Sequence, residues 1–98
     1  MKPADLLQSR LDAGEVVIMD GGTGTEIKRR GVPLCPETWS GRASLTHLDL
    51  IRHIHEDYIR AGAEVIITNT FSTSRSSLEL GGLAGQTAEI NRSAVRMA

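Results

Sequence analysis

A glycine-rich segment near the N-terminus carries the residues best suited to binding a small ligand. It has the sequence Asp20-Gly21-Gly22-Thr23-Gly24-Thr25-Glu26 and follows an apolar run at residues 16–19. Backbone N–H groups in such a turn can hold a carboxylate or phosphate, and a following helix start favours negative charge. The segment is not a dinucleotide fingerprint, because Ile27 stands where a third glycine is required. Asp20 could bind the ammonium group of an amino acid, or it could simply cap the turn.

A second group of polar residues follows another apolar run. Asn69, Thr70 and Phe71 come just after Val65-Ile66-Ile67, and Trp39 lies in a proline-containing stretch between the two groups. Residues that end a strand in this way could line a ligand pocket, or they could form an ordinary turn. Trp39 could line the same pocket or pack against a neighbouring helix. The candidate substrate-binding residues are therefore Asp20, Gly21, Trp39, Asn69 and Phe71.

The potential metal ligands are scattered along the chain. Cys35 is the only cysteine, so an internal disulfide is impossible and a cysteine-based metal site lacks partners. His53 and His55 are two residues apart and point to different faces of a helix, and His47 is not three or four residues from either. The sequence thus identifies no catalytic residue and no metal ligand.

The spacing of apolar residues predicts helices that alternate with two short strands. Helices are expected at residues 3–13, 23–30, 46–61, 74–80 and 87–98, with an irregular loop at 32–44. Thr23 with Glu26 and Thr46 with Asp49 have the spacing of capping boxes. Strands are expected at 16–19 and 65–67, rich in β-branched residues as in a parallel sheet. The pattern predicts an α/β protein built from parallel βα units, in which both strand ends meet at one rim.

Composition restricts the possible partners. The chain has 98 residues, of which 40% are hydrophobic and 3% aromatic, and its formal net charge is -1. This balance gives no electrostatic reason to bind nucleic acid or a membrane surface. We see no signal-peptide pattern and no apolar run of about 20 residues. One domain with a cytoplasmic location is the expectation.

Several ordered blocks resemble the opening of the homocysteine S-methyltransferases. They are Asp20 to Glu26, Arg29-Arg30-Gly31, Trp39-Ser40, the stretch from His55 to Ala63, Thr68 to Phe71, and Glu89 with Asn91 and Ala94-Val95. The resemblance implies a (β/α)8 TIM barrel that transfers a methyl group to the homocysteine thiolate and gives methionine. It also implies a zinc ion on the substrate sulfur, a methyl donor, and an amino-acid site at Asp20 and Gly21. Trp39, Asn69 and Phe71 would line the substrate pocket.

The chain also departs from the pattern of that family. Its members hold zinc with three cysteines late in the barrel, whereas Cys35 matches none of them. A full barrel needs about 250 residues. We therefore expect the N-terminal βα units of an incomplete barrel that binds no zinc and is inactive alone. The alternatives are a small non-catalytic module that binds an anionic or amino-acid ligand, and a piece that self-associates or joins the rest of a barrel. The methyl donor is left open.

Overall fold

Helices make up most of the ordered structure in the computed structural model, which describes residues 2–98. All five helices expected from the sequence are present, and a short additional one precedes the longest. In chain order the elements are α1 (Pro3–Asp12), α2 (Thr23–Arg29), α3 (Ala43–Thr46), α4 (Leu48–Arg60), α5 (Arg75–Leu80), the 3-10 turn η1 (Ala84–Gln86) and α6 (Thr87–Met97).

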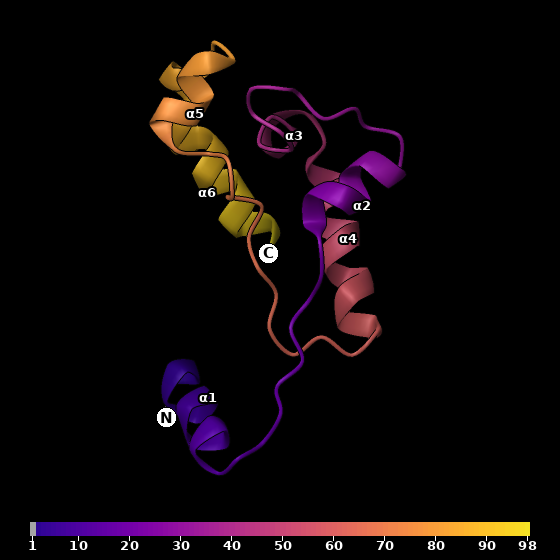
Figure 1. Ribbon diagram of the computed structural model, residues 1–98, viewed down its shortest axis with the longest axis vertical. Coiled ribbons are helices and arrows are strands. Elements are labelled where there is room, and N and C mark those ends of the chain that lie inside the picture. The colour runs from indigo at the N-terminus through magenta and orange to yellow at the C-terminus, as the bar shows by residue number, and fades with distance from the viewer. Residues whose placement is uncertain (1) are drawn as a thin grey trace.

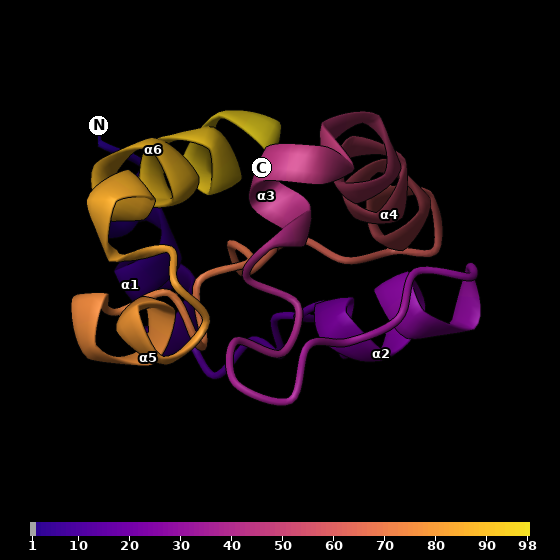
Figure 2. The same cartoon turned by 90° about the horizontal axis from the view of Figure 1, so that it is seen from above.

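The helices form an open arrangement with α1 set apart from the rest. Figure 1 shows α2 beside α4 and α5 beside α6, while α1 lies at the far end of the molecule. Seen from above, α3 lies between α4 and α6 (Figure 2). The radius of gyration is 14.9 Å, larger than the roughly 13 Å of a compact chain of this length. Within residues 2–98, no helix is both long and apolar enough to cross a membrane.

Two apolar clusters hold the helices together. The first joins α2, α3 and α4 through Ile27, Ala43, Ile51 and Ile54, which are at most 3% exposed. The second is formed by Leu78, Leu83 and Ile90, so it joins α5 and α6. Burial of one face of α4 fits its pattern of apolar residues three and four apart. By contrast, α1 buries no residue, and Arg10 ties it to Glu64 by an ion pair of 2.9 Å.

The predicted α/β architecture is wrong for this structure. The described part of the chain contains no strand and no sheet, so it forms no βα unit of a TIM barrel. What remains of the expected pairing is one isolated parallel bridge between Met19 and Val65. It lies where the two extended segments, after α1 and after α4, run side by side in Figure 1.

Acidic side chains replace the backbone pairing at both ends of this bridge. In a longer parallel ladder, the amides of Ile67 and Ile18 would donate to backbone carbonyls. Instead the Ile67 N–H donates to Asp20 Oδ2 at 3.0 Å, and the Ile18 N–H donates to Glu64 Oε2 at 3.3 Å. Ile18, Met19 and Ile67 are each at least half exposed. Two segments without neighbouring strands or a covering layer cannot bury these side chains, so no sheet develops.

The helix starts also differ from expectation. Gly22 caps α2 and His47 caps α4, and neither makes a side-chain capping bond, so both predicted capping boxes are wrong. Glu26 instead bonds Arg29 and Arg30 on its own helix turn. The short helix α3 begins inside the stretch expected to be a loop.

Candidate functional site

The glycine-rich segment and the Asn69 segment line opposite parts of one cavity. The cavity has a volume of about 340 Å³, within the roughly 300–1,000 Å³ of small-molecule sites. Four of the five candidate residues line it, namely Gly21, Trp39, Asn69 and Phe71. Phe71 is 97% exposed, so its ring is available to cover a ligand. The two segments that the sequence singled out are therefore close in space although no sheet joins them.

Asp20 does not line this cavity. Its Oδ2 accepts the Ile67 N–H, which fixes the carboxylate between the two extended segments. Its Oδ1 is buried and has no hydrogen-bond partner among the described residues. A carboxylate oxygen buried in this way is costly unless a donor reaches it. Asp20 thus joins the two extended segments and leaves one oxygen for a further donor.

Gly21 is required at its position by the close approach of Tyr58. A Cβ atom at Gly21 would lie 2.9 Å from the Tyr58 hydroxyl, nearer than real Cβ contacts. The same hydroxyl donates to the Gly22 carbonyl at 3.3 Å. Tyr58 of α4 therefore sets the course of the glycine-rich segment. Tyr58 is not among the candidate residues predicted from the sequence, because a close approach to glycine leaves no local pattern.

The side-chain amide of Asn69 clamps the segment around Ser40. It accepts the Ser40 hydroxyl at 2.8 Å, donates to the Ser40 carbonyl at 2.9 Å and donates to Ser44 Oγ at 3.1 Å. Asn69 is 5% exposed and Ser44 is fully buried. Sequence reasoning missed both serines, since 25 residues or more separate them from Asn69 and nothing local marks the contact.

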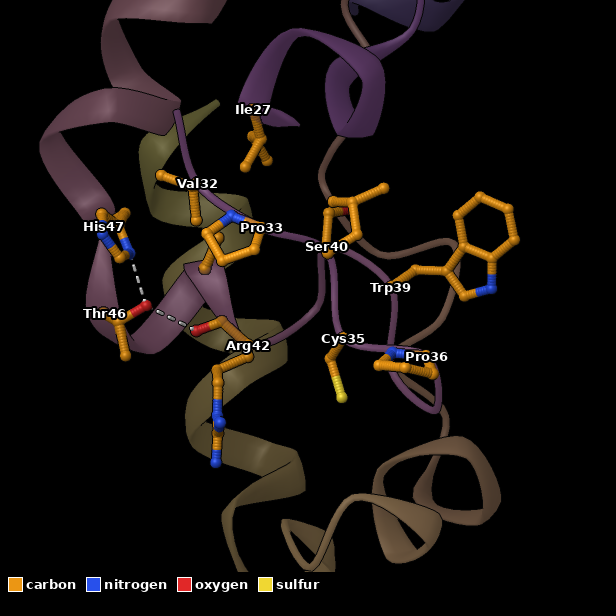
Figure 3. Close-up of a pocket in the computed structure, with 12 residues that line it drawn as sticks. Ile27, Val32, Pro33, Cys35, Pro36, Trp39, Ser40, Arg42, Thr46 and His47 are labelled. Atoms are coloured by element: carbon orange, nitrogen blue, oxygen red, sulfur yellow. Dashed lines mark hydrogen bonds between the residues drawn. The ribbon is translucent and has the colours of Figure 1, made fainter. Parts of the chain in front are cut away.

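A second cavity lies on the other side of the Trp39 turn. It measures about 390 Å³ and is lined mostly by apolar residues of α2, α3 and the segment between them. Figure 3 shows Pro36 and Trp39 on one side of it and Thr46 and His47 on the other. Leu34, Trp39 and Ser40 line both cavities. The turn that carries Trp39 is thus the wall between them.

Ion pairs surround the C-terminal half of α2. Arg29 and Arg30 hydrogen-bond to Glu26 and lower the pKa of its carboxyl from 4.5 to about 2. Arg30 also reaches Asp57 of α4 at 2.9 Å, which ties the two helices together. The Glu26 carboxylate is therefore ionised near neutral pH and paired with two arginines, so it does not act as an acid or base there.

The buried histidine of α4 predicts how stability depends on pH. His55 is 2% exposed, and burial lowers its pKa below 6.5 while the charge of Asp20 acts in the opposite direction. The unfolded chain therefore binds a proton first as the pH falls, which favours unfolding. We expect the free energy of unfolding, measured by urea denaturation, to decline below about pH 6.5 and level off once folded His55 is protonated.

The variant His55→Leu isolates this effect, because the exposed His47 and His53 remain in place. Neither ring nitrogen of His55 has a partner in the described structure, so an apolar replacement leaves no orphaned group. The decline that begins below about pH 6.5 and is caused by His55 should then disappear. An unchanged pH profile in the variant would contradict the assignment.

The donor set for a zinc ion is not present in the described residues. Across residues 2–98, no group of three or more histidine, cysteine or acidic side chains is placed to hold a metal ion. Cys35 is a free cysteine whose thiol donates to Glu37 Oε2 at 3.1 Å. The described residues therefore do not fit the zinc expected for the family.

Together these features define a helical chain with a cavity of about 340 Å³ beside a glycine-rich turn. The profile of the homocysteine S-methyltransferase family matches residues 17–98. The chain belongs to the homocysteine S-methyltransferase family. This confirms the resemblance seen in the sequence motifs.

Individual relatives agree with the family match. A homocysteine S-methyltransferase of Escherichia coli strain K12 is 34% identical over 77 residues, which cover 79% of this chain and 25% of that protein. Betaine–homocysteine S-methyltransferase 1 of Xenopus tropicalis is 44% identical over 77 residues, covering 78% of this chain and 19% of that protein. A selenocysteine methyltransferase of Astragalus bisulcatus is 34% identical over 77 residues, which cover 79% of this chain and 23% of that protein. The chain thus spans about a quarter or less of these relatives, and no solved structure matches it significantly.

Proposed function

We propose that this chain binds the amino-acid end of homocysteine, as part of methyl transfer to the homocysteine sulfur that gives methionine. One observation carries the proposal: in a chain of this family, Gly21, Trp39, Asn69 and Phe71 converge on one cavity of about 340 Å³. The methyl donor remains unassigned, because relatives of differing printed names match equally large parts of the chain.

The cavity offers different contacts for the two ends of an amino acid. The exposed backbone at Gly21 and Gly22 has no side chain to block a carboxylate or ammonium group. The Oδ1 of Asp20, the residue before this turn, has no hydrogen-bond partner among the described residues, and an ammonium group that reached it would supply one. Trp39 and Phe71 provide apolar surface for the methylene groups of the substrate.

The proposal is confined to substrate binding. The described residues do not fit a zinc ion, and the chain covers a minor part of its relatives, so methyl transfer by this chain alone is not proposed. A cytoplasmic location is proposed on the single free thiol of Cys35, which suits a reducing compartment.

Calorimetric titration of L-homocysteine into the chain tests the proposal. We expect saturable binding, and truncation of the cavity side chain in Phe71→Ala should weaken it by roughly tenfold, because ligand burial against the ring is lost. Leu80→Ala is the matched control, since Leu80 is also exposed but does not line the cavity.

The competing function is a module that binds any small anion. If inorganic phosphate binds as tightly as homocysteine and displaces it, this second function is supported and ours is refuted. Absence of homocysteine binding, or equal losses in Phe71→Ala and Leu80→Ala, would also refute the proposal.

A further inference from the structure

The side-chain amide of Asn69 has little capacity left for a ligand. Both of its amide hydrogens are donated, to the Ser40 carbonyl and to Ser44 Oγ, and its oxygen accepts the Ser40 hydroxyl. A carboxamide has two hydrogens to donate and two lone pairs to accept with, so one lone pair remains. A substrate that formed more than one hydrogen bond with the Asn69 side chain would have to break one of these existing bonds.

The turn held by this clamp has an unfavourable backbone conformation. Trp39 has a φ of 52°, in the left-handed region that residues other than glycine rarely adopt. Its N–H donates to the Cys35 carbonyl at 2.7 Å, and the Cys35 N–H donates to the Trp39 carbonyl at 3.0 Å. Such a conformation persists only where the surroundings hold it. The next residue, Ser40, is the one that Asn69 holds by both its side chain and its carbonyl.

We propose that Asn69 is a positioning residue, which fixes the Trp39 turn as the wall between the two cavities and does not itself bind the substrate. The proposal rests on the proposed homocysteine site, whose cavity Trp39 lines. It assigns to Asn69 a role different from the direct contact expected from the sequence. Loss of the clamp would free Trp39 and let the two cavities merge.

A matched pair of variants separates this role from general stability. Asn69→Asp keeps the shape and one acceptor of the side chain but removes both amide donors. Asn91→Asp makes the same change in a second, partly buried clamp, where Asn91 donates to the carbonyls of Thr73 and Thr87. The hydrogen bonds of the Asn91 side chain end on Thr73 and Thr87, and none of them reaches residues 35–40.

Trp39 is the only tryptophan of the chain, so its fluorescence reports on the turn directly. We expect Asn69→Asp to lower the anisotropy of Trp39, to raise its quenching by acrylamide and to weaken homocysteine binding by roughly tenfold, because the bonds that hold Ser40 and Ser44 lose their amide donors. Asn91→Asp should leave the tryptophan signal unchanged. If Asn69→Asp does not fold, as judged by circular dichroism, Ser40→Ala removes one bond of the clamp and should give the same changes at smaller size.

The outcomes distinguish this inference from the proposed function. Unchanged Trp39 signals in both Asn69→Asp and Ser40→Ala, or equal changes in Asn91→Asp, would overturn the positioning role. If homocysteine fails to bind the original chain while Trp39 is freed in Asn69→Asp, the proposed function fails and the positioning of Trp39 stands.

Discussion

Replacing Ile54 with alanine should destabilise the chain by about 2–5 kcal/mol, the largest effect expected of any single substitution. Ile54 is completely buried in the cluster that joins α2, α3 and α4. Removing three of its carbons loses their transfer free energy and leaves a cavity that the surrounding helices fill only in part. A domain of this size has only about 5–15 kcal/mol in total, so a large part of it would be lost. Urea denaturation followed by circular dichroism measures the change.

Ile59→Ala is the matched control for this experiment. It makes the same truncation five residues further along α4, but Ile59 is 52% exposed and lies outside the cluster. A change within about 0.5 kcal/mol is expected there. Equal losses in the two variants would mean that the α2–α3–α4 cluster is not the main core.

The variant Asn91→Ala should lower the free energy of unfolding by about 2 kcal/mol, the second-largest effect. Asn91 donates to the Thr73 carbonyl at 2.8 Å and accepts the Thr73 hydroxyl at 2.6 Å, which attaches the segment before α5 to α6. Thr73 is 2% exposed, and in the variant its hydroxyl can still donate to the Thr70 carbonyl, whereas its own carbonyl loses the Asn91 donor. A buried polar group without a partner costs about 1–3 kcal/mol. The better helix propensity of alanine offsets roughly 0.6 kcal/mol of this.

Thermal or urea unfolding measures the Asn91→Ala loss against Arg92→Ala. Arg92 is the next residue of α6 and is exposed, so its truncation should leave stability nearly unchanged. If Asn91→Ala were as stable as Arg92→Ala, the contact between Thr73 and α6 would contribute nothing to the fold.

Periodicity predicted the helices well because a helix is set by neighbours three and four residues apart. The burial of Ile51 and Ile54 on one face of α4 follows directly from that spacing. A strand is different, since its stability depends on partners distant in sequence. Val65-Ile66-Ile67 has the composition of a buried strand, yet Ile67 is 50% exposed here because no further strand or helix layer covers it. The α/β prediction failed for this reason.

The candidate site was predicted in part. The segments around Gly21 and Asn69 were singled out by residue type, and they do line one cavity. The partners that fix them, Tyr58 at Gly21 and Ser40 at Asn69, were missed because their contacts bridge 29 residues or more. The predicted capping box at Thr23 and Glu26 failed for a different reason. Arg29 and Arg30, one turn further along the chain, hydrogen-bond to Glu26 in place of the backbone N–H group at the helix start.

The carboxylates that flank the Met19–Val65 bridge have a consequence for alignment. Every residue has a backbone carbonyl, so backbone acceptors are available however the two segments are aligned. A carboxylate is present at one position only, so it can accept a given amide in only one alignment. Sliding one segment by two residues would deprive the amides of Ile18 and Ile67 of their acceptors. Asp20 and Glu64 therefore fix the register of the two segments. In most sheets the register is fixed by the burial of one face.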